Sequence, residues 1–258
     1  MEVKRVAEEW KIWDKEEEVA KSEAEAKKLV PEQFYRWIKI FGKKQLERMP
    51  TQKIWDHAID IKEGFVPRKG KMYPLLREER EEMYEFIQEQ LRKEYIRLSK
   101  LPQTALVFFI GKKDGKKRMV QDYRYLNEWT IKNNYSLPLI SDIVENIGTK
   151  KVFTKIDLRW SYNNVWIKEG DEWKAAFMTS EGSFKPTVMF FGLTNSPVTF
   201  QAMINELLRD LINMGKIAAF IDDVIVGTKM EEGHNEIVAE IIKRLEENDL
   251  YVKPEKCK

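Results

Sequence analysis

The residues best placed to do chemistry in this sequence are two adjacent aspartates, Asp222 and Asp223, which separate two apolar runs. The runs 217–221 and 224–227 have the composition of buried strands, and a two-residue join between them predicts a hairpin with both aspartates at its tip. Two neighbouring anions repel each other, so this pair is costly unless it faces water or a cation. Taken alone, the stretch is explained slightly better by a solvated acidic turn than by a divalent-metal site.

A third aspartate changes that balance. Asp157 ends the alternating segment 152–157, which predicts a strand, and a turn or loop is expected over 158–164. If the strand lies beside the hairpin, Asp157 and Asp222 share one or two hard cations through oxygen ligands of the kind that magnesium prefers. Two such ions activate an attacking hydroxyl and stabilise a leaving pyrophosphate in an in-line displacement.

The second chemically capable group is the cationic run 112–118, in which Asp114 is the only acidic residue. A strand over 106–110, an Asp-Gly turn signal and a returning strand over 118–121 predict a β-hairpin here. A solvated loop explains most charge runs. A phosphate grip would instead use lysine for point charge and arginine for a bidentate fork.

The composition limits the classes of protein to consider. The chain has 258 residues, 43% hydrophobic and 34% charged, with a formal net charge of +2, which suits one large or two intimate domains. So balanced a charge predicts no particular partner, and any nucleic-acid surface must come from local clustering. No apolar run is long enough to span a bilayer, the acidic start is unlike a signal peptide, and no P-loop, metalloprotease helix or internal repeat is present. The single Cys257 excludes an internal disulfide and a cysteine-built zinc site, and is typical of a reducing compartment.

Periodicity predicts the elements that must position these residues. Amphipathic spacing favours helices over 77–91, 142–147 and 236–247, and a longer helix that Asn195 caps and Gly215 ends. Further strands are expected over 58–61, 166–174, 175–177 and 250–252.

The remaining stretches give weaker signals. His57 is expected on the surface or in a local hydrogen bond, and His234 at the exposed start of the last helix. Residues 1–30 mix acidic and basic side chains and are interpreted as a helical linker, while 31–42 is expected to pack as helices.

Several motifs, taken in order, carry a resemblance to a known family. They are Lys112–Arg118, Asp122–Asn127, the strand ending at Asp157, Ile167–Lys174, Phe191–Gln201 and Phe220–Asp223. Through them the chain, from about residue 31 to its end, resembles the reverse transcriptase of gypsy-type LTR retrotransposons.

The resemblance implies an α+β fold of the right-hand polymerase type. Fingers and palm would be present, with a small antiparallel palm sheet packed on helices, and the thumb absent. The implied boundaries are 1–30 for the linker and 31–258 for the reverse transcriptase. Within it, the palm would cover approximately 132–164 and 196–258, and the fingers approximately 75–131 and 165–195.

The implied activity is that of an RNA-directed DNA polymerase, which transfers a nucleotide from a dNTP to the 3′-hydroxyl of a primer. By resemblance, Asp157, Asp222 and Asp223 are the catalytic residues and hold two Mg²⁺ ions, or Mn²⁺ in their place. The backbone carbonyl of Leu158 is expected to assist them.

The resemblance also implies contacts to nucleotide and nucleic acid. Lys112 and Arg118 would reach the triphosphate, and the ring of Tyr162 would lie under the sugar and exclude a 2′-hydroxyl. Template and primer would be bound largely through their phosphates. The predicted contacts are Lys113, Lys116 and Arg124.

The implied partners are an RNA or DNA template with its primer, dNTP, and the rest of a Pol polyprotein with protease, RNase H and integrase, but no membrane. The expected location is inside the cell, in the cytoplasm within a virus-like particle or in the nucleus, and not outside it.

Some positions depart from the family pattern, such as Phe220, where tyrosine is usual, and Met178, where arginine is frequent. None of them removes a metal ligand. They leave open a catalytically inactive retroelement remnant that retains the fold and nucleic-acid binding. A viral palm RNA polymerase is a third interpretation, which the motif 191–201 argues against.

Overall fold

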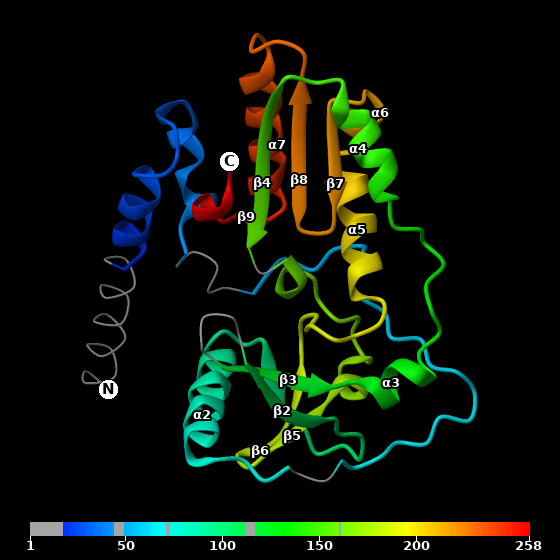
Figure 1. The fold of residues 1–258 in the computed structure, drawn as a ribbon. Helices are drawn as coiled ribbons and strands as arrows, with labels where there is room; N and C mark the ends of the chain where they lie inside the picture. The colour runs from blue at the N-terminus through cyan, green and yellow to red at the C-terminus, as the bar shows by residue number, and fades with distance from the viewer. Residues whose placement is uncertain (1–17, 44–48, 71–72, 112–116, 160) are drawn as a thin grey trace. The chain divides into compact units, whose positions relative to one another are not determined.

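The computed structural model describes residues 18–43, 49–70, 73–111, 117–159 and 161–258, without the side chain of Arg118 (Figure 1). The chain divides into two compact units. Unit 1 comprises Met1–Arg48, Pro138–Ser161 and Ile204–Lys258, and unit 2 comprises Met49–Leu137 and Tyr162–Met203. Within the described ranges, no helix has both the length and the apolar character needed to cross a membrane.

Unit 1 contains a four-stranded antiparallel sheet in the order β7-β8-β4-β9, visible in Figure 1. Its strands are β4 (Val152–Arg159), β7 (Ile217–Phe220), β8 (Asp223–Thr228) and β9 (Tyr251–Val252). β4 pairs with β8 from Val152↔Thr228 to Asp157↔Asp223. It continues two residues beyond the predicted end at Asp157, because Leu158 and Arg159 pair with β9.

Helices of unit 1 cover this sheet. They are α4 (Ile140–Gly148), α6 (Arg209–Asn213), α7 (His234–Glu247) and the 3-10 helices η1 (Glu32–Phe41) and η5 (Pro254–Lys256). Unit 1 has a further helix over 18–27. α7 packs on β8 and η1, and it buries Val238, Ile241 and Leu245, whose spacing is that of one helix face. The predicted helices near 142–147 and 236–247 are confirmed.

Unit 2 has a three-stranded sheet in the order β1-β6-β5 and a separate hairpin of β2 and β3. Its elements are α2 (Arg77–Arg92), β1 (Ile96–Leu98), β2 (Leu106–Gly111), β3 (Lys117–Asp122), α3 (Arg124–Trp129), η4 (Glu172–Ala175), β5 (Phe177–Thr179) and β6 (Gly182–Pro186). Met83 and Ile87 of α2 are fully buried in a core with Phe177 and Tyr123. The Tyr123 hydroxyl donates to the carbonyl of Ala175 at 2.9 Å, which satisfies the one polar atom that this ring buries.

Two predicted strands of unit 2 are wrong, and the one expected over 175–177 starts only at Phe177, because Ala175 ends η4. The stretch 58–61 makes only isolated bridges at its edges, from His57 to Ile167 and from Ile61 to Thr130, and 166–174 gives single bridges followed by η4. Side-chain contacts replace the strand ladder here: the amide of Ile59 donates to the Asp171 carboxylate at 2.8 Å, and the Lys174 ammonium donates to the Ile59 carbonyl at 2.7 Å.

The long helix predicted from residue 195 to Gly215 is two helices, α5 (Ser196–Leu207) and α6. Leu208 separates them because its φ of −115° and ψ of 17° lie outside helical values. The predicted cap by Asn195 is also wrong. Its side-chain amide donates to the carbonyl of Ile131 at 2.9 Å and its oxygen accepts from the amide of Asn133 at 3.1 Å, so the side chain fixes a neighbouring loop. The chain crosses between the two units after Arg48, after Leu137, within η3 (Ser161–Asn164) and within α5.

Both histidine predictions are wrong, because both side chains are buried. His57 is 2% exposed, and its Nδ1 lies 2.9 Å from the Thr199 hydroxyl, far along the sequence. His234 is 4% exposed and lies between the hydroxyls of Thr154 and Thr228. Burial lowers the pKa of His57 to about 4 and also lowers the pKa of His234. Neither ring serves as a surface group.

Candidate active site

The acidic hairpin turns one residue earlier than predicted. β7 ends at Phe220, which pairs with Asp223, so the two-residue loop is Ile221-Asp222 and not Asp222-Asp223. Ile221 has a φ of 53°, which is unusual for a β-branched residue and costs about 1–3 kcal/mol of strain. This turn makes Asp223 the first residue of β8, which aligns it with β4.

The register brings Asp157 and Asp223 together as direct Cα partners. Directly opposed residues of antiparallel strands project their side chains to the same face, with Cα atoms roughly 4.5–5.5 Å apart. The amide of Leu158 donates to the carbonyl of Asp222 at 2.8 Å, which ties the loop to β4. Because the two polar groups of a strand residue point to the same side, the Leu158 carbonyl also faces the loop. We call the group of Asp157, Asp222 and Asp223 the acid end of the sheet.

Lysine side chains already neutralise two of these carboxylates. The Lys253 ammonium lies 2.8 Å from Asp157 Oδ1, the Lys256 ammonium 3.9 Å from Asp157 Oδ2, and the Lys155 ammonium 2.9 Å from Asp223 Oδ1. The hydrogen bond to Asp223, helped by the charges of the other two aspartates, raises the pKa of Lys155. Across the part of the chain that the structure describes, no three histidine, cysteine, aspartate or glutamate side chains converge as a metal-holding group.

Backbone hydrogen bonds of residues 253–258 to β4 hold Lys253 beside Asp157. The amide of Lys253 donates to the carbonyl of Asp157 at 2.8 Å, and Lys258 exchanges backbone hydrogen bonds with Lys155. Arg159 makes two hydrogen bonds to the Glu255 carboxylate, at 2.8 and 3.0 Å, which holds η5 against β4. Sequence reasoning missed these lysines. The position of Lys155 could have been inferred, since it lies two residues before Asp157 on the same strand face. Lys253 lies 96 residues away from Asp157, and no local pattern in the sequence indicates their contact.

Tyr162, the predicted sugar contact, is 8% exposed and belongs to an aromatic cluster of unit 2. Its ring centroid lies 4.8 Å from that of Phe191 and 6.0 Å from that of Phe200, the latter in a T-shaped arrangement. Phe191 is 48% exposed, whereas Phe200 is fully buried. One side of the Tyr162 ring is therefore fixed in the core by Phe200.

The loop that carries Phe191 is fixed by Asn127. The Asn127 side chain donates to the carbonyl of Gly192 at 2.7 Å and accepts from the amide of Thr194 at 2.9 Å. Gly192 has a φ of 100°, and a Cβ there would lie 3.3 Å from the Tyr123 ring, so both backbone conformation and space favour glycine. These contacts give the motifs 122–127 and 191–201 a shared structural role.

The predicted basic contacts are only partly described. Lys112, Lys113 and Lys116 lie outside the described residues. The backbone of Arg118 pairs with Ile110 in the β2–β3 hairpin, which confirms that hairpin.

Arg124 makes a two-pronged ion pair with Asp122, at 2.9 and 2.6 Å, and this pair lowers the pKa of the Asp122 carboxyl. The Arg124 side chain is 85% exposed, so its charge still faces solvent.

Residues 110–258 match the family model of reverse transcriptase (RNA-dependent DNA polymerase). The chain belongs to the reverse transcriptase family. Two transposon polyproteins of Schizosaccharomyces pombe, Tf2-3 and Tf2-7, are each 33% identical to it over 229 residues. Each alignment covers 88% of this chain and 17% of the polyprotein, so the chain spans about a sixth of these relatives. The gypsy-type assignment within the family stays a prediction.

Solved structures show the same fold. The foamy viral protease-reverse transcriptase in complex with RNA/DNA hybrid matches with a TM-score of 0.78 at 22% identity, over 95% of this chain and 33% of that one. Its dRH form in complex with double-stranded DNA matches with a TM-score of 0.73 at 24% identity, over 94% of this chain and 43% of that one. The predicted α+β polymerase fold of fingers and palm is confirmed.

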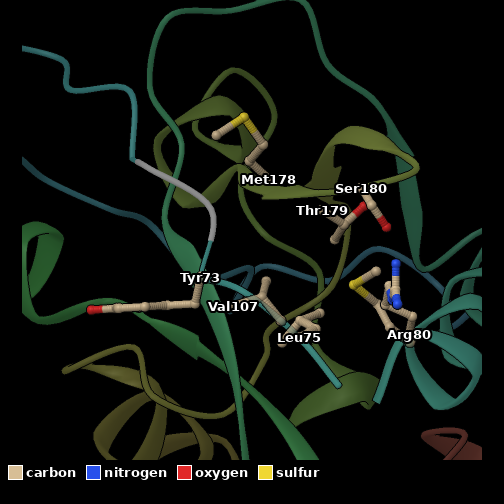
Figure 2. A pocket seen from close by; sticks show the side chains of 8 residues that line it. Tyr73, Leu75, Arg80, Val107, Met178, Thr179 and Ser180 are labelled. Carbon is tan, nitrogen blue, oxygen red and sulfur yellow. The ribbon is translucent and has the colours of Figure 1, made fainter. Parts of the chain in front are cut away.

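A small pocket in unit 2 of this reverse transcriptase chain is lined by none of the predicted site residues. Its volume is about 90 Å³, and Figure 2 shows its side chains. They are Tyr73, Leu75, Arg80, Met83, Val107, Met178, Thr179 and Ser180. Since ligand pockets commonly measure about 300–1,000 Å³, this one is too small for a nucleotide.

Proposed function

We propose that this chain is the fingers and palm of an RNA-directed DNA polymerase, which transfers a nucleotide from a dNTP to the 3′-hydroxyl of a primer. The observation that carries the proposal is the in-register pair Asp157↔Asp223, next to a loop that holds Asp222 in a strained turn. Strained backbone persists where the surrounding structure enforces it, and it is concentrated at functional sites.

The donor set of the acid end fits Mg²⁺ or Mn²⁺ in its chemistry. Asp157, Asp222 and Asp223 supply hard carboxylate oxygens, and the Leu158 carbonyl faces the same loop. When bound, two divalent ions supply Lewis-acid chemistry for phosphoryl transfer. The aspartates would fix the positions of these ions, and the surrounding lysines would reduce the repulsion among the carboxylates.

For the nucleotide, we propose that Lys112 and Arg118 hold the triphosphate and that Tyr162 excludes a ribose 2′-hydroxyl. The contacts of the Tyr162 ring with Phe191 and Phe200 support the last role, because a ring whose position is restricted by packing is a more effective steric barrier.

Template and primer would be contacted by Lys113, Lys116 and Arg124. An RNA/DNA hybrid and double-stranded DNA are bound by the foamy viral proteins of the same fold, which supports this class of partner.

The chain would act as part of a Pol polyprotein with protease, RNase H and integrase, inside the cell. The polyprotein relatives and the single cysteine support these assignments. The other candidate is an inactive remnant that keeps the fold and binds nucleic acid.

The test is primer extension on a primed RNA template with dNTP and with rNTP, together with filter binding of the same duplex. Extension with dNTP supports the polymerase, binding without extension supports the remnant, and failure of both contradicts the two candidates. Tyr162→Ala should raise the rNTP to dNTP ratio of kcat/KM about tenfold, which corresponds to about 1.4 kcal/mol of lost discrimination. Phe65→Ala, in a separate aromatic cluster of unit 2, is the control that should leave this ratio unchanged.

A further inference from the structure

The charges of the acid end are balanced before any divalent ion enters. Three carboxylates lie near three ammonium groups, those of Lys155, Lys253 and Lys256. Asp222 differs from the other two acids, because it makes no ion pair within 4.0 Å with another described residue. The ammonium groups therefore already reduce the repulsion among the three carboxylates that a divalent ion would otherwise relieve.

The contact of Lys253 with Asp157 is a built feature rather than a chance surface pair. The Asp157 side chain is 9% exposed and that of Lys253 is 21% exposed. Lys253 is also held by its backbone, because its amide donates to the carbonyl of the same Asp157. By contrast, Lys243 and Glu247 on α7 are 3.9 Å apart with both side chains more than half exposed, which is typical of pairs that contribute little.

An ammonium and a metal ion compete for the same carboxylate oxygen. Lys253 approaches Asp157 Oδ1 at 2.8 Å, which is hydrogen-bond distance, whereas a magnesium ion needs that oxygen at about 2.1 Å. If the Lys253 ammonium and a magnesium ion both approached the same lone pair of this oxygen, the two positive charges would repel each other strongly. Without the lysine, in turn, Asp157 would be a nearly buried and unpaired charge, which is costly.

We propose that Lys253, assisted by Lys155, is a built-in counter-cation that occupies the acid end in the metal-free protein and that a divalent ion must displace. This inference rests on the proposed function, since it assumes that the acid end holds the metal. The lysines keep the empty site folded and neutral, and they lower its affinity for a free metal ion. Lys253 is thus a residue that sets metal affinity without being a ligand.

The test measures binding of Mn²⁺ alone to the full chain, by the loss of the free-ion signal in electron paramagnetic resonance. Lys253→Met should bind Mn²⁺ about tenfold more tightly than the parent protein, and Lys253→Arg should stay close to the parent because it keeps the charge. Lys243→Met is the matched control: it removes the same charge from unit 1 and should leave the affinity unchanged.

Thermal unfolding gives a second readout that needs no catalysis. In chelator, Lys253→Met should unfold at a lower temperature than the parent, because Asp157 loses its partner. Saturating Mn²⁺ should then raise its Tm by more than it raises that of the parent, since the tighter complex stabilises more at equal metal concentration. If Lys253→Met does not fold, Mn²⁺ binding and thermal unfolding are measured instead on Lys155→Met, which removes the more exposed pair with Asp223.

The outcomes separate this inference from the proposed function. If the parent binds Mn²⁺ and Asp223→Asn weakens that binding, but neither lysine variant binds more tightly, the inference is overturned and the metal site stands. If neither the parent nor the lysine variants bind Mn²⁺, the metal site fails, and the inference fails with it.

Discussion

The two halves of β4 stabilise polar groups in opposite ways. Toward the start of the strand, neutral hydroxyls of Thr154 and Thr228 contact the two nitrogens of the buried His234 ring at 2.8 and 2.9 Å. At the end of the strand, the Asp157 carboxylate is paired with the charged ammonium groups of Lys253 and Lys256. One half is closed by neutral hydrogen bonds, whereas the other is neutralised by cations that another cation could replace.

The hydrogen bonds around His234 assign a proton to Nδ1 of its ring. The Thr228 hydroxyl donates to the carbonyl of Met230 at 2.7 Å, so its oxygen must accept from Nδ1–H of the ring. Burial lowers the pKa of the His234 ring and so favours its neutral form, in which Nε2 accepts from the hydroxyl of Thr154. Both ring nitrogens thus have a hydrogen-bond partner within this small network. The neutral hydrogen bonds at the start of β4 therefore favour stability, whereas the exchangeable ion pairs at its end favour chemistry.

The sharpest test of this difference is Asp223→Asn at the charged half. Primer extension should fall by orders of magnitude, because the variant removes a proposed metal ligand. The free energy of unfolding should stay the same or rise slightly, since the half-exposed pair with Lys155 contributes little and one repelling charge is gone. Urea denaturation and primer extension on one preparation measure both. Loss of the fold would mean that this carboxylate is structural.

At the neutral half, His234→Leu should have the opposite effect: it should lower stability and leave the metal site unchanged. Thr228 keeps its bond to Met230, but the half-buried Thr154 hydroxyl loses its ring partner, so the free energy of unfolding should fall by about 1–3 kcal/mol at most. Binding of Mn²⁺ at the acid end should be unchanged. Urea denaturation with a parallel Mn²⁺ titration checks this, and a change in metal affinity would show that the two halves of β4 are coupled.

Lowering the pH should also reduce stability through the half of β4 that contacts His234. Burial lowers the pKa of His234, so the folded protein binds fewer protons than the unfolded chain below about pH 6.5, and its stability falls as the pH falls. His57 of unit 2, whose pKa is about 4, adds a loss of about 2 kcal/mol by pH 5. Denaturation at pH 7 and pH 5 should therefore show a smaller loss in His234→Leu than in the parent. An equal loss would mean that His234 is already protonated in the fold.

The sequence predicted the parts of the fold that depend on local signals. Residues close together in the sequence determine the amphipathic spacing of α2 and α7 and the alternation in β4. The β2–β3 hairpin was predicted correctly from its two strand patterns and the Asp-Gly signal between them. What it could not predict depends on partners far away in the chain. His57 is buried through Thr199, 142 residues along, and Lys253 reaches Asp157 through strand pairing that no local pattern encodes.

The position of the acidic turn was missed for a different physical reason. Turn rules place residues that tolerate left-handed backbone at the tip, which favoured Asp222-Asp223 and argued against Ile221. The pairing of Phe220 with Asp223 overrides that local preference, and the strain falls on the isoleucine. A mistake of one residue here is informative, because it marks the place where the fold works against local preference.

The smallest effect is expected from Ile221→Gly, which tests whether this strain matters. Glycine adopts a φ of 53° without a steric cost but loses more entropy on folding, so relief of the strain should stabilise the protein by about 1 kcal/mol at most. The same change loosens the loop that holds Asp222, and primer extension should fall moderately while the fold is kept. The control is Asp249→Gly, at another left-handed residue of unit 1 with a φ of 58°, which should stabilise less, because aspartate tolerates this backbone better than isoleucine, and should cause no loss of extension. If both variants extend primers as well as the parent, the strained turn is a by-product of strand register, and the acid end depends on the pairing of β4 with β8 alone.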